Sequence, residues 1–339
     1  MAVNLSIFNS KSMQRFLPKA LLFVLLLAGL DRGLGAILQH FYSKTLYGEN
    51  WPKQNWLLSS RFDVVILGSS RTFRHYVPSI IEREIGYTVF NAGENGQYLL
   101  YAIALGNLIL ERYTPKVIIL DMLPSFLVEL PDTDLEWDRL EILLPYADDP
   151  TVSDMLNRKS RFESIKRLSK LYRFNSLVLN IADNIRNGPQ DYDNGYVSIG
   201  VPRFRPKNPF ILDTIDEQII RPDSLKRAML VSFIKKAQQR GATVVMSFSP
   251  SLAPVSDRVA CQLDAFDRLA DELDIPFLAI RTEEFPEFAD QTLFMDYIHM
   301  NAQGAEKFSA VFARQVAEIM QTKPKPPAGL SLQGVVENK

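Results

Sequence analysis

Two short stretches of this chain carry side chains whose types and spacing could perform chemistry together. The first is residues 68–71, Gly-Ser-Ser-Arg, which directly follows an apolar run rich in β-branched residues. Small residues after a buried strand allow a sharp turn into a helix and leave a hydroxyl standing above the sheet. The second stretch holds Asp296 and His299, spaced as a carboxylate and the histidine base that it orients. We predict that the fold brings Ser70, Asp296 and His299 together, with Ser69 as the alternative nucleophile.

Composition narrows the classes of site that this chain can build. With 339 residues, 47% of them hydrophobic, the chain can bury a large core, and its net charge of −1 indicates no nucleic-acid partner. The single cysteine, Cys261, excludes an internal disulfide and any multi-cysteine metal site. The three histidines, His40, His75 and His299, show no metal-ligand spacing. We therefore expect neither a metal nor a cofactor.

The N-terminal region predicts a membrane anchor. Residues 16–38 are apolar and would span about 34 Å as a helix, enough to cross a bilayer. Basic residues precede this segment, so the positive-inside tendency places residues 1–15 in the cytoplasm and the rest, after a linker at 39–60, outside the inner (cytoplasmic) membrane. The rival interpretation is a cleaved signal peptide, because the uninterrupted apolar run, 20–30, is only 11 residues long. We favour the uncleaved anchor because no small-x-small cleavage site follows.

Two ionisable residues, Asp31 and Arg32, fall near the outer end of this apolar segment. They either mark the membrane–water interface, where arginine can extend toward water, or contact a polytopic partner.

Downstream of residue 61, predicted strands and helices alternate. Apolar strands separated by helices are typical of a parallel sheet with helices on both faces, a three-layer flavodoxin-like α/β fold. We assign residues 61–320 to this domain, with an insertion at 123–221, and predict a flexible tail at 321–339. The predicted strands are 62–67, 87–91, 116–121, 242–248 and 276–280, and the predicted helices are 78–85, 98–113, 223–240, 257–273 and 302–320.

Within the insertion, residues 151–173 place apolar side chains at helical spacing opposite a basic face. That face is either a solvated helix surface or a contact with anionic lipid headgroups or an acidic polymer. Arg203, Arg205 and Lys207, in a loop rich in Gly and Pro, are weaker candidates for contact with substrate.

The candidate residues all follow predicted strands. In open parallel sheets, sites form at the carboxyl ends of the strands. Ser70 follows the first strand, residues 91–96 (Asn-Ala-Gly-Glu-Asn-Gly) the second, Ser125 the third, 247–251 the fourth, and the Asp296 loop the fifth.

This pattern, Gly-Ser-Ser followed by Asn-x-Gly-x-x-Gly and a final Asp-x-x-His-x-Asn-x-x-Gly, resembles the SGNH/GDSL hydrolase superfamily over residues 60–125 and 223–320. The resemblance implies Ser70 as nucleophile, His299 as general base and Asp296 as its orienting carboxylate. Gly96 would donate its N–H to the oxyanion, unless it serves only the turn.

Two departures from the superfamily pattern affect this assignment. Ser69 replaces the usual aspartate, and the Gly-x-Asn-Asp block after the third strand is missing. Ser125 aligns with the missing asparagine, and Asn95 is the alternative oxyanion donor. Arg71 would either bind an anionic group beside the nucleophile or form a structural ion pair.

The combination of anchor, elbow and insertion resembles the DltD-like and polysaccharide O-acetylation branches of the superfamily. This resemblance implies an extracytoplasmic O-acyltransferase component that passes an acyl group through a serine ester to an envelope polysaccharide, beside a polytopic membrane-bound O-acyltransferase. A membrane-anchored esterase or deacetylase and a non-catalytic assembly or binding subunit are the alternatives. We expect His75 to be a surface or helix-start residue, and Asp121 to serve in capping or a salt bridge.

Overall fold

Five short apolar segments form a parallel sheet in the order β2-β1-β3-β4-β5. The computed structural model describes residues 10–44, 53–129, 133–187, 193–205, 221–253 and 255–322. In the middle of the sheet, Ile66 pairs with Asn91 of β2 on one side and with Ile119 of β3 on the other. The strands are β1 (Val64–Leu67), β2 (Val89–Asn91), β3 (Val117–Asp121), β4 (Thr243–Phe248) and β5 (Phe277–Ala279).

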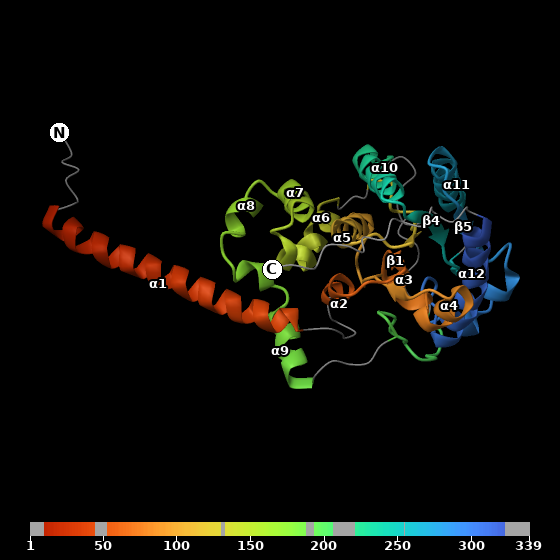
Figure 1. Cartoon of the computed structure of the whole chain (residues 1–339), viewed down its shortest axis with the longest axis horizontal. Coiled ribbons are helices and arrows are strands. Elements are labelled where there is room, and N and C mark those ends of the chain that lie inside the picture. The colour runs from red at the N-terminus through yellow and green to blue at the C-terminus, as the bar shows by residue number, and fades with distance from the viewer. Residues whose placement is uncertain are drawn as a thin grey trace, which may run out of the picture.

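Alternate residues of each strand enter two separate hydrophobic clusters, because side chains alternate across a sheet. Val65 and Leu67 of β1 pack with one set of helices, whereas Val64 and Ile66 pack with the other. Figure 1 shows these helices on the two sides of the strands. The first set is α5 (Leu99–Arg112), α10 (Ser224–Gln239) and α11 (Asp257–Glu272), and the second is α4 (Pro78–Ile85) and α12 (Ala302–Thr322).

The prediction of a parallel α/β sheet flanked by helices is therefore confirmed. Bounds of the predicted strands and helices agree with the structure to within two residues. The agreement follows from local signals, such as Gly86 in the left-handed region after α4 and Asp223 accepting from the Lys226 N–H at the start of α10. Shorter elements are α2 (Gln54–Ser59), α3 (Ser70–His75), η5 (Pro286–Phe288) and η6 (Gln291–Leu293).

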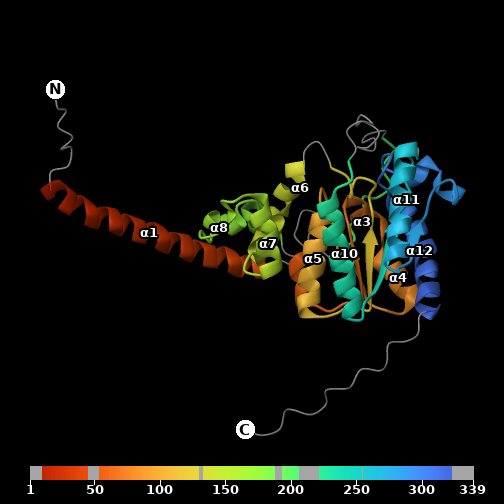
Figure 2. The ribbon, with the colours of Figure 1, turned by 90° about the horizontal axis from the view of Figure 1, so that it is seen from above.

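Helix α1 (Ser10–Ser43) is 34 residues long and projects away from the sheet (Figure 2). Its segment Met13–Ser43 contains an 18-residue stretch with a mean hydropathy of 2.0 and is long and apolar enough to cross a membrane. The helix continues past the predicted end of the anchor at residue 38, into the region predicted to be a linker. Residues 45–52 of that linker, Lys207 and all but the start of the predicted tail lie outside the described residues.

Between β3 and α10 the chain forms a cluster of short helices, which we call the insertion. They are α6 (Thr133–Arg139), η1 (Leu140–Tyr146), α7 (Pro150–Lys159), α8 (Glu163–Lys166), η2 (Tyr172–Phe174) and α9 (Val178–Asn187). The expectation of one helical segment at 151–173 is wrong. The chain leaves the helical conformation at Ser160, where the backbone is extended (φ −158°, ψ 140°), and Glu163 then turns into the interior.

The break also removes the continuous basic face. Lys159 binds Asp138 and Glu141, Lys166 binds Glu163, and the side chain of Arg167 turns inward. Opposite charges thus neutralise much of what the linear pattern presents as a positive stripe.

Gly93, in the loop after β2, packs against the turn that carries Ser70. A Cβ added there would lie 2.5 Å from the backbone nitrogen of Phe73 and 2.9 Å from the carbonyl oxygen of Ser69. We expect Gly93→Ala to lower the free energy of unfolding by about 1–3 kcal/mol, because backbone atoms must shift to admit the methyl group. Urea unfolding of the detergent-solubilised chain, followed by Trp fluorescence, measures this. Gly33→Ala, which meets nothing within 4 Å, is the control, and equal stability of the two variants would contradict the prediction.

Candidate active site

The turn from β1 into α3 sets the two serines in different environments. Ser69 is the N-cap of α3, and its hydroxyl accepts the Arg71 N–H at 3.3 Å. It is only 3% exposed, whereas Ser70, the first residue of the helix, is half-buried. Gly68 makes this turn possible, because a Cβ there would clash with the hydroxyl of Thr72. The structure therefore leaves Ser70, and not Ser69, with its hydroxyl directed to a partner outside its own helix.

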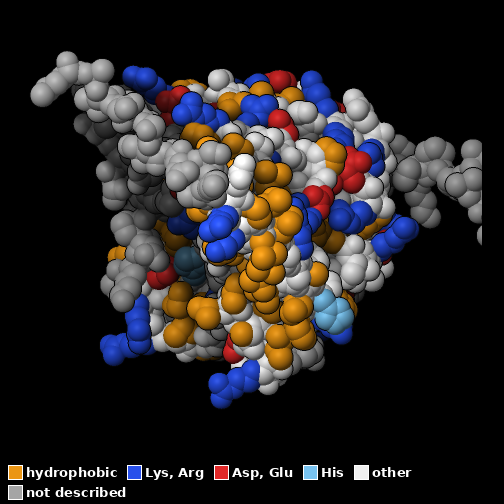
Figure 3. Space-filling model, turned by 90° about the vertical axis from the view of Figure 1, so that its left-hand side faces the viewer, with side chains coloured by type: hydrophobic (Ala, Val, Ile, Leu, Met, Phe, Trp, Pro, Cys, Tyr) orange, Lys and Arg blue, Asp and Glu red, His pale blue; other side chains and the backbone are white. Residues whose placement is uncertain are grey.

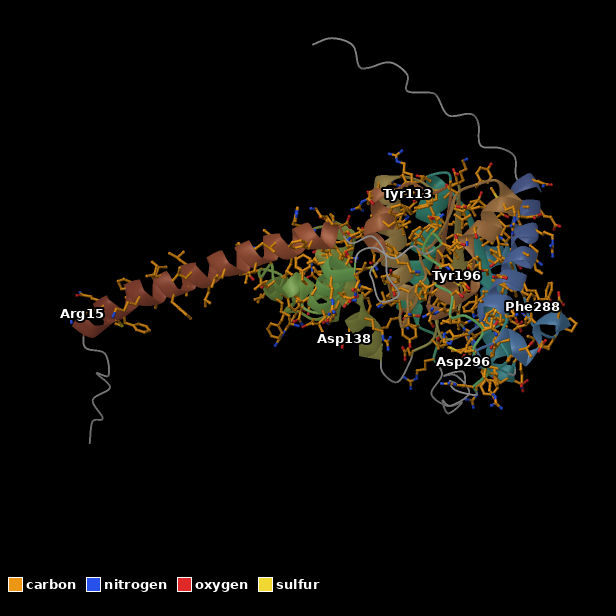
Figure 4. The ribbon with its side chains drawn as sticks, turned by 90° about the horizontal axis from the view of Figure 1, so that it is seen from below. Arg15, Tyr113, Asp138, Tyr196, Phe288 and Asp296 are labelled. Atoms are coloured by element: carbon orange, nitrogen blue, oxygen red, sulfur yellow. The ribbon has the colours of Figure 1, made fainter. Side chains whose placement is uncertain are left out.

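That partner is His299, 229 residues downstream. Ser70 Oγ lies 2.8 Å from His299 Nε2, and His299 Nδ1 lies 3.0 and 3.1 Å from the two carboxylate oxygens of Asp296. With the proton on Nδ1 donated to Asp296, Nε2 is left to accept from the Ser70 hydroxyl. Figure 4 places Asp296 at the opposite end of the α/β part from Tyr113, which precedes β3, so the three residues lie at the carboxyl edge of the sheet.

Asp296 is held in its charged form. Burial raises its pKa, but hydrogen bonds from the His299 side chain and from the N–H groups of Ile298 and His299 outweigh burial and lower the pKa below its ordinary value. The carboxylate thus stays ionised beside the imidazole. This is the arrangement that stabilises an imidazolium when a histidine takes a proton.

His75 fixes the loop that carries His299. Its Nε2 accepts the Met300 N–H at 3.0 Å, and its Nδ1–H donates to Ser249 Oγ at 2.9 Å. The side chain is completely buried, and burial lowers its pKa well below the ordinary value. The expectation of a surface or helix-start residue is wrong because these buried partners come from the segment just after β4 and from the last loop, which the local sequence does not reveal.

Arg71 is also buried, with an exposed fraction of 1%. Its guanidinium donates to the carbonyl and hydroxyl oxygens of Ser249 and lies 4.5 Å over the Phe248 ring. Asp121, at the end of β3, accepts hydrogen bonds from Thr72, Tyr76 and the Ser249 N–H. Both residues therefore serve in the structure as internal links between α3 and the ends of β3 and β4.

The loop after β2 holds the candidate oxyanion donors. The N–H groups of Gly93, Glu94 and Asn95 are used within the fold, by Asn91 Oδ1, the Gly68 carbonyl and Glu94 Oε1. Gly96 has a positive φ of 69°, and its N–H has no acceptor among the described residues. Asn95 is exposed and Ser125 is buried, and neither of them hydrogen-bonds to the Ser70 hydroxyl within the described structure.

Two buried ionisable residues, Lys53 and Glu94, support this loop, and the sequence analysis missed them. Lys53 Nζ donates to the carbonyl oxygens of Gly93 (2.6 Å) and Asn91 (3.1 Å) and lies 3.8 Å over the Phe73 ring. Burial raises the pKa of Glu94 to about 7. The one feature of the sequence that could have indicated these buried residues was the acidic residue inside the glycine motif at 91–96.

The described residues contain no group of three or more His, Cys, Asp or Glu side chains placed to hold a metal ion.

No protein-family model and no curated protein matches this chain. Among solved structures, the chain is similar to an acetyl xylan esterase, Est2A, from the rumen bacterium Butyrivibrio proteoclasticus, with 9% sequence identity and a TM-score of 0.34. The match covers 76% of this chain and 63% of the esterase chain, less than two thirds of that protein. A likeness this distant supports no inference about chemistry, which rests on the geometry above.

The neutral, buried state of His75 predicts a pH-dependent stability. Its pKa in the folded chain lies below the unfolded value of about 6.5, so its contribution is complete above that pH and is lost as pH falls. We expect the excess stability of the wild type over His75→Gln to fall by up to about 1.4 kcal/mol per pH unit below pH 6.5. Urea unfolding at pH 5 to 8 measures the difference, and a constant difference across this range would contradict the assignment.

Proposed function

We propose that this chain is a membrane-anchored, serine-dependent acyltransferase of the SGNH type. The observation that carries the proposal is the contact of Ser70 Oγ with His299 Nε2 at 2.8 Å, combined with the contact of His299 Nδ1 with Asp296. A hydroxyl, a base and an orienting carboxylate in this order are the parts that nucleophilic acyl transfer requires.

The geometry suggests a two-step reaction. Ser70 Oγ attacks the carbonyl carbon of an acyl donor while His299 Nε2 takes the hydroxyl proton, and Asp296 stabilises the imidazolium. Collapse of the tetrahedral intermediate breaks the bond to the leaving group, and His299 gives its proton to that group. The acyl group remains on Ser70 as an ester. An acceptor hydroxyl then gives its proton to His299 and attacks that ester, which transfers the acyl group and restores the Ser70 hydroxyl.

Both tetrahedral intermediates need hydrogen-bond donors for the oxyanion. The Gly96 N–H is the proposed first donor, since it has no acceptor among the described residues. Ser125 or Asn95 is the proposed second donor, in the place of the asparagine that the superfamily uses. Each donor typically contributes about 3 kcal/mol of transition-state stabilisation.

Transfer and hydrolysis use the same residues and differ in whether a hydroxyl or water resolves the ester. Helix α1 supports transfer, because an anchor keeps the site beside a membrane that can supply the acyl group. We therefore propose a site outside the cytoplasm, with an envelope polysaccharide as acceptor and a polytopic O-acyltransferase as donor partner. An anchored esterase is the competing activity, and a non-catalytic assembly subunit is the competing role.

An activated serine reacts with a fluorophosphonate. We expect intact-mass analysis of the full chain in detergent to show one adduct, which is absent in Ser70→Ala. In His299→Ala the rate of adduct formation should fall by about 10³-fold or more. Ser69→Ala is the matched control and should label like the wild type. Equal labelling of Ser70→Ala and wild type, or no labelling of a folded wild type, would contradict the catalytic assignment.

The lifetime of the acyl-enzyme separates transfer from hydrolysis. After a pulse of p-nitrophenyl acetate, we expect an acetyl adduct on Ser70 that outlasts the loss of the reagent, because a transferase must hold its ester against water until an acceptor arrives. Intact-mass measurements over time give its half-life, with Ser70→Ala as the control for acetylation elsewhere. Continuous turnover with no adduct would favour the esterase.

A further inference from the structure

Two faces of α1 differ beyond residue 30. One face, formed by residues at helical spacing from Asp31 to Tyr42, packs on the insertion. Asp31 accepts hydrogen bonds from the Ser169 hydroxyl (2.5 Å) and from the N–H groups of Lys170 (2.9 Å) and Leu171 (3.2 Å). Gly35, one turn on, lets Lys170 approach closely, and Leu38 and Tyr42 pack against the insertion's apolar residues Phe174, Leu177 and Ile181. A second face, about a quarter turn around the helix, presents exposed apolar side chains, at Leu34, Ile37 and Phe41.

This arrangement bears on where the bilayer would end along α1. A hydrocarbon core of about 30 Å needs about 20 helical residues. A span of that length that begins at Phe16 reaches Gly35, so it includes Asp31. A carboxylate at that depth is costly unless it is paired or hydrogen-bonded, and the 169–171 turn supplies three donors. The insertion therefore covers Asp31 at the level of the outer membrane interface.

The insertion also exposes large apolar side chains next to this contact. Phe162, Ile165 and Leu168 are 50%, 62% and 66% exposed, and they directly precede the turn that binds Asp31. Figures 1 and 2 both show α8 beside the C-terminal part of α1. Figure 3, which faces the end from which α1 projects, shows hydrophobic side chains gathered along α1, with Lys and Arg around them. Apolar residues flanked by cations are typical of segments that lie in a membrane interface.

A cleft of about 430 Å³ opens between α1 and the insertion at the same level. Its lining carries the cations Arg32, Lys170 and Arg173 and one carboxylate, Asp148. Arg173 binds Asp148 through two hydrogen bonds, of 2.5 and 2.7 Å, and Lys170 Nζ lies 3.8 Å from the same carboxylate. With Asp31 at the edge of the cleft, next to Arg32, three positive charges stand against two negative charges. The net charge of +1 suits an anion.

We propose that this cleft binds the phosphate of an anionic phospholipid in the outer leaflet, while Phe162, Ile165 and Leu168 enter the boundary of the acyl chains. Lipid is the favoured occupant because the apolar side chains of Leu25 and Leu21 are exposed on the same side of α1 as Arg32, two and three turns toward the N-terminus. A lipid whose phosphate sits at Arg32 and Lys170 can extend its chains along them. Together with the Asp31 contact, the bound lipid would hold the insertion, and through it the α/β part, at one orientation to the membrane. The inference rests on α1 crossing the bilayer and is independent of the chemistry at Ser70.

Native mass spectrometry of the full chain in detergent tests the cleft. Dihexanoyl phosphatidylglycerol and dihexanoyl phosphatidylcholine are titrated against the wild type, Arg32→Gln, Lys170→Gln and the control Lys235→Gln, an exposed cation of α10. We expect the wild type and the control to prefer phosphatidylglycerol, and each cleft variant to bind it about fivefold more weakly. Equal binding of the two lipids, or equal loss in the control, overturns the proposal. Displacement by glycerol 3-phosphate at equal concentration would assign the cleft to a soluble anion and overturn it too.

The depth of the insertion is a second readout. A fluorophore is attached to Ile165→Cys in a Cys261→Ser background, and the chain is placed in nanodiscs that contain brominated phospholipid. We expect quenching at position 165 and none at Leu225→Cys on α10. Equal fluorescence at both positions would overturn the membrane contact. Fluorophosphonate labelling of the same samples keeps this test separate from the proposed function, because the cleft variants should still label in detergent if Ser70 is reactive.

Discussion

The placement of the site depends on one buried carboxylate. Asp121, at the end of β3, accepts hydrogen bonds from the hydroxyls of Thr72 (3.0 Å) and Tyr76 (2.8 Å) on or just after α3, and from the Ser249 N–H (3.2 Å) after β4. Burial raises the pKa of Asp121, although Arg71 and these donors act in the opposite direction. A carboxylate in the interior is costly unless its oxygens are satisfied, so the helix that begins at Ser70 has one favourable position relative to β3 and β4.

The same network extends to the histidine. Ser249 Oγ accepts hydrogen bonds from the Arg71 guanidinium and the His75 ring. His75 in turn accepts a hydrogen bond from the N–H of Met300, the residue after His299. The positions of Ser70 and His299 are therefore set by one connected set of buried polar groups. The contact between Ser70 and His299 is consequently a property of the core beneath the site, and not of the two side chains alone.

A second carboxylate, in the long apolar helix α1, is also satisfied by hydrogen bonds from a distant segment. Asp31 is satisfied by the 169–171 turn, so the carboxylate that the sequence places in an apolar helix becomes the link between α1 and the insertion. The insertion in turn packs on α5 through α7. A continuous set of packed elements thus connects α1 to the sheet, so the site at the sheet's edge has a defined orientation relative to α1.

The sequence by itself determined the order and type of the main elements, because β-branched runs, glycine stops and caps act within a few residues. It also determined the Asp296–His299 pair, whose spacing is local, and the long apolar helix. Only the tertiary structure decided that Ser70, and not Ser69, faces His299, that Arg71 and His75 are buried links, and that Lys53 and Glu94 lie under the glycine loop. It also decided that residues 151–173 break at Ser160. In each case the outcome depends on partners brought from distant positions, since a polar side chain can be buried only where another segment satisfies its hydrogen bonds or charge.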